Sequence, residues 1–415
     1  MDQQQLIPHL FRTEFSRITA VLCKTLGLQH IDAAEDIASE TFLAAFETWP
    51  YRGIPENPTA WLYVVAKNKA KNYLSRQNLF KNKVSHQLQR MQVEPDEMTI
   101  EMTETNINDG QLQMMFAVCH PSIPVESQVG LSLRILCGFG IDEIANAFLA
   151  NKETITKRLQ RAKEKLRSGN IKMEFPSPPE IMARLDTVLL TLYLLFNEGY
   201  YSESNDAILR EDLCREAMRL TRLMLENEKT DQPEVNALYA LMCFHASRFE
   251  ARKNEHGELV LYHDQDESKW NPGLIAKGAY HLNRASGGNR ISRYHLEAGI
   301  AYWHTQKQDS IEKWQNILQL YNRLLQISYS PIAALNRTYA LSKVQGKQKA
   351  IDEAEKLKLN DNPYYYSLLG ELYRGINDSR SKQYFEYALA VARTEPEREV
   401  ITNKISTLIS QQQNL

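Results

Sequence analysis

The chain has 415 residues, 49 Lys and Arg, 51 Asp and Glu, and a formal net charge of −2. This length suits two or three domains, and a hydrophobic fraction of 43% provides material for their cores. With only 17 Gly and 15 Pro, the composition favours helices over β folds with many turns. The five cysteines form no C-x-x-C pair, which argues against a zinc site and a disulfide framework. There is no signal pattern and no apolar run of membrane-spanning length, so we expect a cytoplasmic protein with no membrane contact.

Residues 10–80 are predicted to form helices. Apolar side chains spaced by three and four predict helices over Leu10–Leu26, Asp32–Trp49 and Thr59–Arg76. The stretch Pro50–Pro58 is rich in turn residues and predicts a loop between the second and third helices.

The third predicted helix combines aromatic and basic residues, and no acid occurs from Asn57 to Val93. Cations neutralise phosphates and aromatic rings stack on exposed bases, so this pattern suits an opened nucleic-acid strand. Trp61 could equally be a core residue. The chain then becomes acidic, and 81–109 is predicted to be a linker. Its acidic part could compete for the basic face or simply be solvated.

A second basic region lies at Ile141–Arg167. A short helix over Ile141–Phe148 is followed by a break at Leu149–Asn151, where Asn151 is a plausible N-cap. Lys152–Arg167 holds seven basic residues against two acids. Four apolar residues are predicted to face inward: Ile155, Leu159, Ala162 and Leu166. This is a helix-turn-helix pattern, whose second helix can enter the major groove of DNA. The alternative is a solvated, charged helix of an ordinary bundle.

A further helix over Pro124–Cys137 is predicted to bury the helix-turn-helix pair. After Arg167 a turn-rich stretch marks a second boundary. The rest of the chain is predicted to be helical, with ten helices over Ile181–Phe196, Arg210–Leu225, Glu234–Ala251, Ile275–Asn283, Tyr294–His304, Ile311–Ile327, Pro331–Gln345, Lys347–Lys358, Pro363–Gly375 and Arg380–Glu395.

Two of these helical hairpins align with each other. Pro331 and Pro363 are 32 residues apart, which is close to the 34-residue tetratricopeptide repeat. Such repeats stack into a solenoid whose concave face usually binds a partner, so we expect a protein or peptide partner for this region.

A cluster of acids offers a rival interpretation. Asp264, Asp266 and Glu267 lie close together beside His263 and could bind a divalent cation, or they could form a loop that caps neighbouring helices. No nucleophile, phosphate loop or H-E-x-x-H motif accompanies them. We therefore expect no enzyme, no metal and no cofactor, although a metal-dependent enzyme built on this cluster stays open.

The first 170 residues resemble the extracytoplasmic-function sigma factors, which are bacterial promoter-recognition subunits. Three stretches carry the match: AAEDIASETFLAAFETW, NPTAWLYVVAKNKAKNYLSR and IDEIANAFLANKETITKRLQRAKEKLR. Residues 173–415 resemble the long C-terminal extension of one subgroup, with its YLLFNEGY, GELV and DQD motifs followed by tetratricopeptide-like helices. Two departures are visible: Glu267 follows DQD where arginine is usual, and the LAN turn lacks a common glycine.

The resemblance implies roles for particular residues. The first stretch would contact the clamp of core RNA polymerase through Asp36, Glu40, Phe42 and Phe46. The following loop and helix would bind the melted minus-ten element through Arg52, Gly53, Asn57, Trp61, Lys67, Asn68, Lys71 and Arg76. The helix-turn-helix would bind the minus-thirty-five element through Thr154, Lys157, Arg158, Arg161 and Lys165.

These observations predict an all-α protein with two small DNA-binding domains and a repeat domain. Sigma region 2 would occupy 1–80, the linker 81–109, the helix-turn-helix sigma region 4 110–170 and the tetratricopeptide-like extension 175–415. The predicted function is promoter-specific transcription initiation with RNA polymerase core and promoter DNA, modulated by the repeat domain. The main alternative is a one-component helix-turn-helix regulator with a repeat sensor, which would act without polymerase docking.

Overall fold

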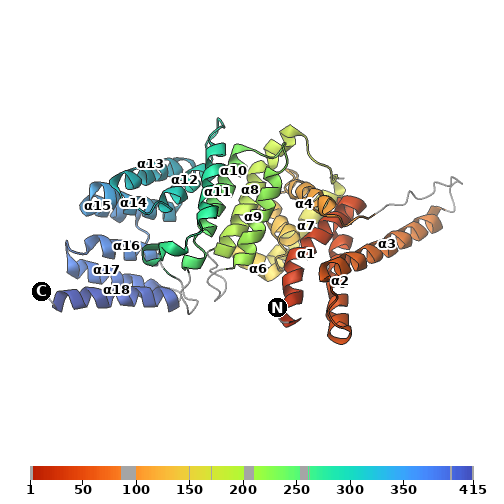
Figure 1. The fold of residues 1–415 in the computed structure, drawn as a ribbon, viewed down its shortest axis with the longest axis horizontal. Helices are drawn as coiled ribbons and strands as arrows, with labels where there is room; N and C mark the ends of the chain where they lie inside the picture. Colours follow the sequence, from red (N-terminus) through yellow and green to blue (C-terminus); the bar gives the residue numbers. More distant parts are fainter. Residues whose placement is uncertain are drawn as a thin grey trace. The chain divides into compact units, whose positions relative to one another are not determined.

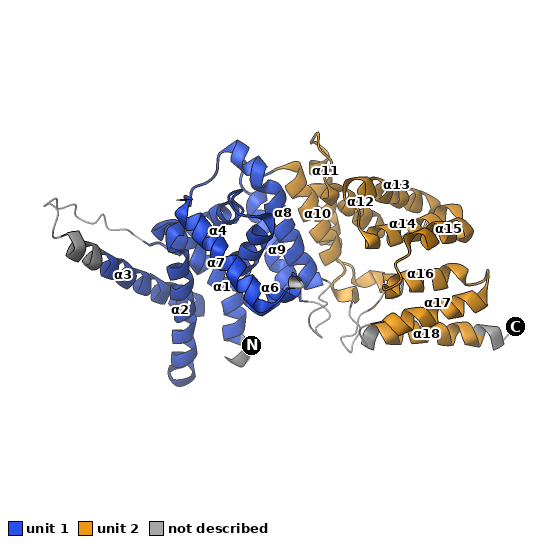
Figure 2. Ribbon diagram, turned by 180° about the vertical axis from the view of Figure 1, so that it is seen from behind, with its two compact units in different colours: residues 1–231 blue, residues 232–415 orange. Residues whose placement is uncertain are grey.

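The computed structural model describes residues 3–85, 100–148, 150–169, 171–200, 210–252, 260, 262–392 and 395–413. These residues contain eighteen α-helices, four short 3-10 helices and no strand, which confirms the all-α prediction (Figure 1). The chain divides into two compact units, Met1–Asp231 and Gln232–Leu415 (Figure 2). None of the described helices combines the length and the apolar character needed to cross a lipid bilayer.

Unit 1 begins with α1 (Gln3–Leu26), the short η1 (Leu28–His30), α2 (Ile31–Arg52) and α3 (Pro58–Ser85). The three predicted helices are therefore present, and each is longer than expected. Helix α2 continues through Pro50 and ends at Arg52. Gly53 caps it, with a φ of 83° that is accessible to glycine and an amide that donates to the Trp49 carbonyl oxygen at 3.0 Å. The loop predicted over Pro50–Pro58 is therefore shorter than expected, because its first three residues belong to α2 and Pro58 begins α3.

Helix α4 (Glu104–Val118) was not predicted from the sequence, and it begins inside the predicted linker. Thr103 caps it by accepting a hydrogen bond from the Asn106 amide at 3.3 Å. A Cβ added to Gly110 would lie 3.3 Å from the backbone of Ala20, so this glycine lets α4 approach α1 closely. The buried side of α4 includes glycine and the polar Gln111, which weakens its apolar pattern. Residues 86–99 of the predicted linker lie outside the described residues.

Helices α5 (Val125–Leu136), α6 (Ile141–Ala147) and α7 (Lys152–Ser168) form the predicted helix-turn-helix and its supporting helix. Asn151 is the N-cap of α7, since its Oδ1 accepts a hydrogen bond from the Thr154 amide at 2.7 Å. The four residues predicted to face inward from α7 are all buried, which confirms the helical spacing: Ile155, Leu159, Ala162 and Leu166.

Unit 1 also contains α8 (Pro178–Tyr200) and α9 (Glu211–Leu225). A Cβ added to Gly199 would lie 2.7 Å from both the Arg210 carbonyl oxygen and Cys214 Sγ, so the glycine of YLLFNEGY permits a close α8–α9 approach. Arg184 of α8 donates to the Phe116 carbonyl oxygen of α4 at 3.1 Å. Helices α8 and α9 thus pack on the same body as the helix-turn-helix.

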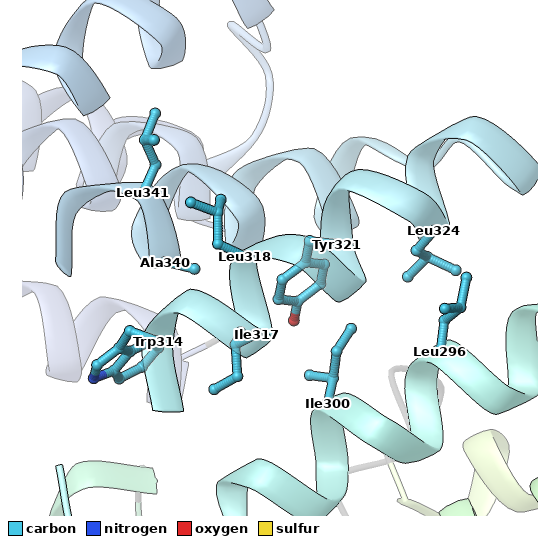
Figure 3. Packing of buried hydrophobic residues seen from close by; sticks show 9 residues of the cluster. All are labelled: Leu296, Ile300, Trp314, Ile317, Leu318, Tyr321, Leu324, Ala340 and Leu341. Carbon is cyan, nitrogen blue, oxygen red and sulfur yellow. The ribbon is translucent and has the colours of Figure 1, made fainter. Parts of the chain in front are cut away.

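Unit 2 is built of sequential helices. Its elements are α10 (Pro233–Ala246), η2 (Glu250–Arg252), η3 (Tyr262–Asp264), η4 (Glu267–Lys269), α11 (Pro272–Ala285), α12 (Arg293–His304), α13 (Ile311–Ile327), α14 (Pro331–Gln345), α15 (Lys347–Leu357), α16 (Pro363–Tyr373), α17 (Asp378–Val391) and α18 (Glu395–Gln413). Helix α18 was not predicted from the sequence, and α10 ends at Ala246, five residues before the predicted end at Ala251. One core cluster joins α12, α13 and α14 around Trp314 and Ile317 (Figure 3).

The two aligned hairpins of the sequence correspond to α14–α15 and α16–α17. A Cβ added to Gly370 would lie 2.7 Å from the Phe385 ring, and Ser381 Oγ donates to the Gly370 carbonyl oxygen at 2.7 Å. This contact gives the glycine of LLGELYRG a packing role between the helices of one hairpin. The assignment of these hairpins to tetratricopeptide repeats stays a prediction.

Candidate polymerase and nucleic-acid interface

Helix α2 has an outward face that mixes acidic and apolar side chains. Asp36 and Glu40 are exposed, and the Phe46 side chain is left 65% exposed although it is large and apolar. Leu43 is also exposed. Large apolar side chains at a surface mark a site where a partner protein can bind, because burying them removes apolar area from water.

Phe42 does not belong to this outward face. It is buried, and its ring centroid lies 5.0 Å from that of Phe11 on α1. The expectation that Phe42 contacts the polymerase is therefore corrected. Its position in the helical repeat directs it into the core of unit 1, while the neighbouring Leu43 takes the exposed position.

The predicted minus-ten residues lie at the end of α2, in the following loop and along α3. Six of them are exposed: Arg52, Gly53, Asn57, Asn68, Lys71 and Arg76. Asn57 is also the N-cap of α3, because its Oδ1 accepts from the Ala60 amide at 3.0 Å. Lys67 is half-buried, and Lys69 on the same helix pairs with Glu40 of α2 at 2.8 Å. Lys71 thus faces solvent, and Lys69 faces a carboxylate of the neighbouring helix.

The aromatic side chains of α3 serve packing more than the sequence pattern suggests. Trp61 is half-buried, and its ring meets that of Trp49 edge-on at 5.5 Å. Tyr63 donates its hydroxyl to Glu14 Oε2 at 2.5 Å, and burial together with this hydrogen bond raises the pKa of Tyr63. These contacts hold α3 against α1 and α2.

The predicted minus-thirty-five residues share the outward side of α7. Thr154, Lys157, Arg161 and Lys165 are exposed. Arg158 is half-buried, with its guanidinium 5.6 Å from the centroid of the Phe148 ring. Cations displayed along one side of a helix can neutralise DNA phosphates and reach base edges in the major groove.

Another edge of α7 contacts α2, which the sequence analysis did not foresee. Lys163 Nζ lies 3.1 Å from Asp32 Oδ1 and also pairs with Glu35, while Arg167 pairs with Asp32. Arg134 of α5 reaches Glu35 Oε1 at 3.3 Å. Asp32 and Glu35 are three residues apart, and Lys163 and Arg167 four apart, so each pair lies on one side of its helix. That matched spacing was a signal for this contact.

The Glu35–Lys163 pair of this ionic network is largely withdrawn from water, whereas the side chains of Asp32 and Arg167 are 49% and 41% exposed. The Glu35 side chain is 8% exposed and that of Lys163 is 17% exposed. Burial alone would lower the pKa of Lys163, but the negative charges of Glu35 and Asp32 outweigh it and raise that pKa above 10.5. Beside the network lies a cleft of about 370 Å³ between α2 and α7, lined by Asp36, Ser39, Thr156 and Gln160 among others.

The acidic cluster that suggested a metal site has a structural role at Asp266. Asp266 Oδ1 accepts hydrogen bonds from the amide and the hydroxyl of Ser268 at 2.9 and 2.7 Å, and this bonding lowers the pKa of Asp266. It thereby caps η4, as expected for a loop that caps a helix. Among the residues that the structure describes, no group of three or more His, Cys, Asp or Glu side chains is arranged to hold a metal ion. The His263 side chain lies outside them.

In comparisons with known proteins, two parts of the chain match known families. Residues 10–80 match Sigma-70 region 2, and this stretch covers most of α1, all of α2 and most of α3. Residues 184–286 match DUF6596, a family of unknown function. The matched stretch contains the YLLFNEGY and DQD motifs of this chain. No solved structure matches the chain significantly.

The chain is also similar over nearly its whole length to an uncharacterized protein of Rhizobium meliloti (strain 1021). The two are 30% identical over 388 residues, which is 92% of each chain. A Sigma-70 region 2 at the N-terminus supports a role as a sigma factor in transcription initiation, with RNA polymerase core and promoter DNA as partners. The chain therefore belongs to the same family as the Rhizobium protein and carries a Sigma-70 region 2 at residues 10–80.

Proposed function

We propose that this chain is an extracytoplasmic-function sigma factor that directs RNA polymerase to specific promoters. The observation that carries the proposal is the exposed acidic and apolar face of α2 within a Sigma-70 region 2. Asp36, Glu40, Leu43 and Phe46 would dock on the polymerase clamp. Residues on the loop before α3 and along α3 would hold the opened minus-ten strand.

The helix-turn-helix would supply the second promoter contact. Thr154, Lys157, Arg161 and Lys165 on α7 would bind the minus-thirty-five element, and Arg158 would assist at the edge of that surface. Each contact alone is weak, but attachment to one polymerase makes the second contact effectively intramolecular. RNA synthesis itself would belong to the polymerase, in the cytoplasm.

The test is co-purification of the full chain with core RNA polymerase, followed by run-off transcription from promoters selected by the reconstituted enzyme. We expect a stable complex and promoter-specific transcripts. Absence of both from a folded protein would contradict the proposal. A one-component regulator would instead bind duplex promoter DNA without polymerase and would be indifferent to substitution of Asp36 or Phe46.

We further propose that the C-terminal repeats modulate initiation, with a protein or peptide partner as their ligand. Comparing a chain that ends at Asp231 with the full chain in the same transcription assay tests this, since Asp231 closes unit 1. Higher output from the shorter chain would indicate inhibition, and lost output would indicate a required scaffold. Equal output would remove the regulatory role.

A further inference from the structure

We propose that Glu153, at the start of α7, determines base specificity in the minus-thirty-five element by accepting a hydrogen bond from the amino group of a cytosine. Together with Lys157 it recognises one G·C base pair in a fixed strand orientation. This inference rests on the proposed function, because it takes α7 to be the helix that enters the major groove. It adds an acidic residue to a surface for which only Thr154 and basic residues were predicted.

Glu153 lies where a recognition helix meets the edges of the bases. In helix-turn-helix proteins the N-terminal residues of the second helix contact bases in the major groove. Helix α7 begins at Lys152, so Glu153 is its second residue, and its side chain is exposed. Lys157 is exposed one turn later, four residues along the same side of the helix. The two side chains therefore lie next to each other on the side of α7 proposed to contact DNA.

The fold of α7 depends little on Glu153. Asn151 already caps the helix, since its Oδ1 accepts a hydrogen bond from the Thr154 amide at 2.7 Å. Among the residues that the structure describes, the one hydrogen-bond donor to the Glu153 carboxylate is Lys157, whose Nζ lies 2.7 Å from Oε1. The side chains of Lys157 and Glu153 are 62% and 78% exposed, and such pairs contribute little because water and salt screen them. The pair can therefore exchange its mutual contact for contacts with bases at a small cost.

A carboxylate at this position weakens DNA binding unless it has a specific partner. Duplex DNA carries one negative charge per about 1.7 Å of helix axis, so an anion on the contact side lowers affinity for any sequence. Cytosine N4 and adenine N6 are the donors that bases present in the major groove. A carboxylate accepts but does not donate, and adenine places the N7 acceptor beside its donor. Cytosine is therefore the base that Glu153 fits best.

The Glu153–Lys157 pair also matches the order of groups on the edge of a G·C base pair. That edge presents the guanine N7 and O6 acceptors and then the cytosine N4 donor. Lys157 Nζ donates and the Glu153 carboxylate accepts, so the pair offers the complementary groups side by side. An A·T pair instead places the adenine donor between two acceptors. Turning the base pair around reverses the order, which fixes the strand that carries the cytosine.

The experiment compares wild type, Glu153→Ala and Glu153→Gln as full chains reconstituted with core RNA polymerase. Each enzyme selects DNA from a duplex library that is randomised across the promoter region, and the bound DNA is sequenced. We expect wild type to favour cytosine about tenfold at one position of the minus-thirty-five element, and Glu153→Ala to lose that preference alone. Glu153→Gln should favour adenine there, because an amide binds adenine N6 and N7 together.

The matched control is Glu164→Gln, which neutralises the other acid of α7. Glu164 accepts a hydrogen bond from Gln160 Nε2 at 3.0 Å and lies about 16 Å from Glu153 along the helix, at about 1.5 Å per residue. That distance takes it away from the N-terminal turn, so we expect this control to select the same bases as wild type at every position. Circular dichroism verifies that all variants are folded.

The outcomes separate this inference from the proposed function. If wild type selects promoters and both Glu153 variants select the same bases, or bind every sequence equally less well, Glu153 only stabilises α7. The specificity inference is then wrong, while the sigma-factor proposal stands. If folded wild type selects no promoter together with core polymerase, the proposed function fails and the inference fails with it. Loss of one cytosine preference in Glu153→Ala, with adenine favoured by Glu153→Gln, supports both.

Discussion

Helices α2 and α7 each have one paired edge and one open side, and the two helices use these differently. On α2 the paired edge carries Asp32 and Glu35, while the open side presents the apolar Leu43 and Phe46. On α7 the paired edge is cationic and the open side is also cationic. The seven basic residues counted on α7 are therefore not equivalent. Lys163 and Arg167 pair with carboxylates of α2, while Arg161 and Lys165 are exposed on the other side of the helix.

The largest expected effect tests the open side of α2. Replacing Asp36→Lys together with Phe46→Ala should weaken core polymerase binding about hundredfold, because central apolar anchors of an interface cost about 2–4 kcal/mol when removed. The measurement is a binding titration with purified core enzyme. The matched control is Asp352→Lys with Tyr329→Ala, since Tyr329 on unit 2 is also 65% exposed. Equal binding of core enzyme by both double variants would show that the exposed side of α2 is not a polymerase-binding surface.

The second prediction concerns the stability of unit 1 at the contact between α8 and α9, and its expected effect is the next largest. Gly199→Ala should lower the free energy of unfolding by about 2 kcal/mol, because the added methyl group would overlap Arg210 and Cys214 where α8 meets α9. Denaturant titration measures the loss. Gly287→Ala is the control, since its nearest neighbour lies at an ordinary 3.6 Å and a change within about 0.5 kcal/mol is expected. An unaltered midpoint for Gly199→Ala would show that α8 and α9 separate easily there.

The open side of α7 should give a smaller, salt-dependent effect. Arg161→Ala should weaken binding of minus-thirty-five duplex DNA by about 1 kcal/mol and reduce the slope of log affinity against log salt by about 1 if the contact is to a phosphate. Fluorescence anisotropy at several salt concentrations gives both values. Lys172→Ala, which removes an exposed cation outside α7, should leave the slope unchanged. A slope altered equally by both substitutions would mean that α7 has no special role.

The last prediction, with the smallest expected effect, is that the ionic contact between α2 and α7 is lost at high pH. The pKa of Lys163 is raised in the folded protein, so its contribution is fully present below its unfolded pKa near 10.5 and is lost as pH rises through the higher folded pKa. The groups facing it are Asp32 and Glu35, with Arg134 and Arg167 also contacting those carboxylates. Spin labels attached at the exposed positions Gln29→Cys on η1 and Ser168→Cys at the end of α7 report the distance between these elements, which should therefore lengthen only above about pH 10.5.

Lys163→Arg provides the control for this titration. A guanidinium stays protonated throughout that pH range, so the labelled Lys163→Arg protein should keep its short distance where that of the parent lengthens. A longer label distance in both proteins at the same pH would show that a group other than Lys163 controls the separation of α7 from α2.

The amino-acid pattern alone was enough to predict the all-α class, the helix-turn-helix with its Asn151 cap and its inward residues, and the region that matches Sigma-70 region 2. These features depend on local rules, because helical periodicity and capping are written in neighbouring residues. Helix α4 was not predicted because its buried side includes Gly110 and Gln111, and these residues weaken the apolar pattern.

Which side chains of each amphipathic helix are exposed depends on how the helices pack against one another. Periodicity placed Phe42 and Phe46 on one stripe, yet packing against Phe11 buries the first and leaves the second exposed. Likewise, a count of charges cannot distinguish Lys163 from Lys165, because what separates them is a pair of carboxylates 128 and 131 residues away in the chain. Contacts between distant segments depend on how whole helices pack, which no local pattern records.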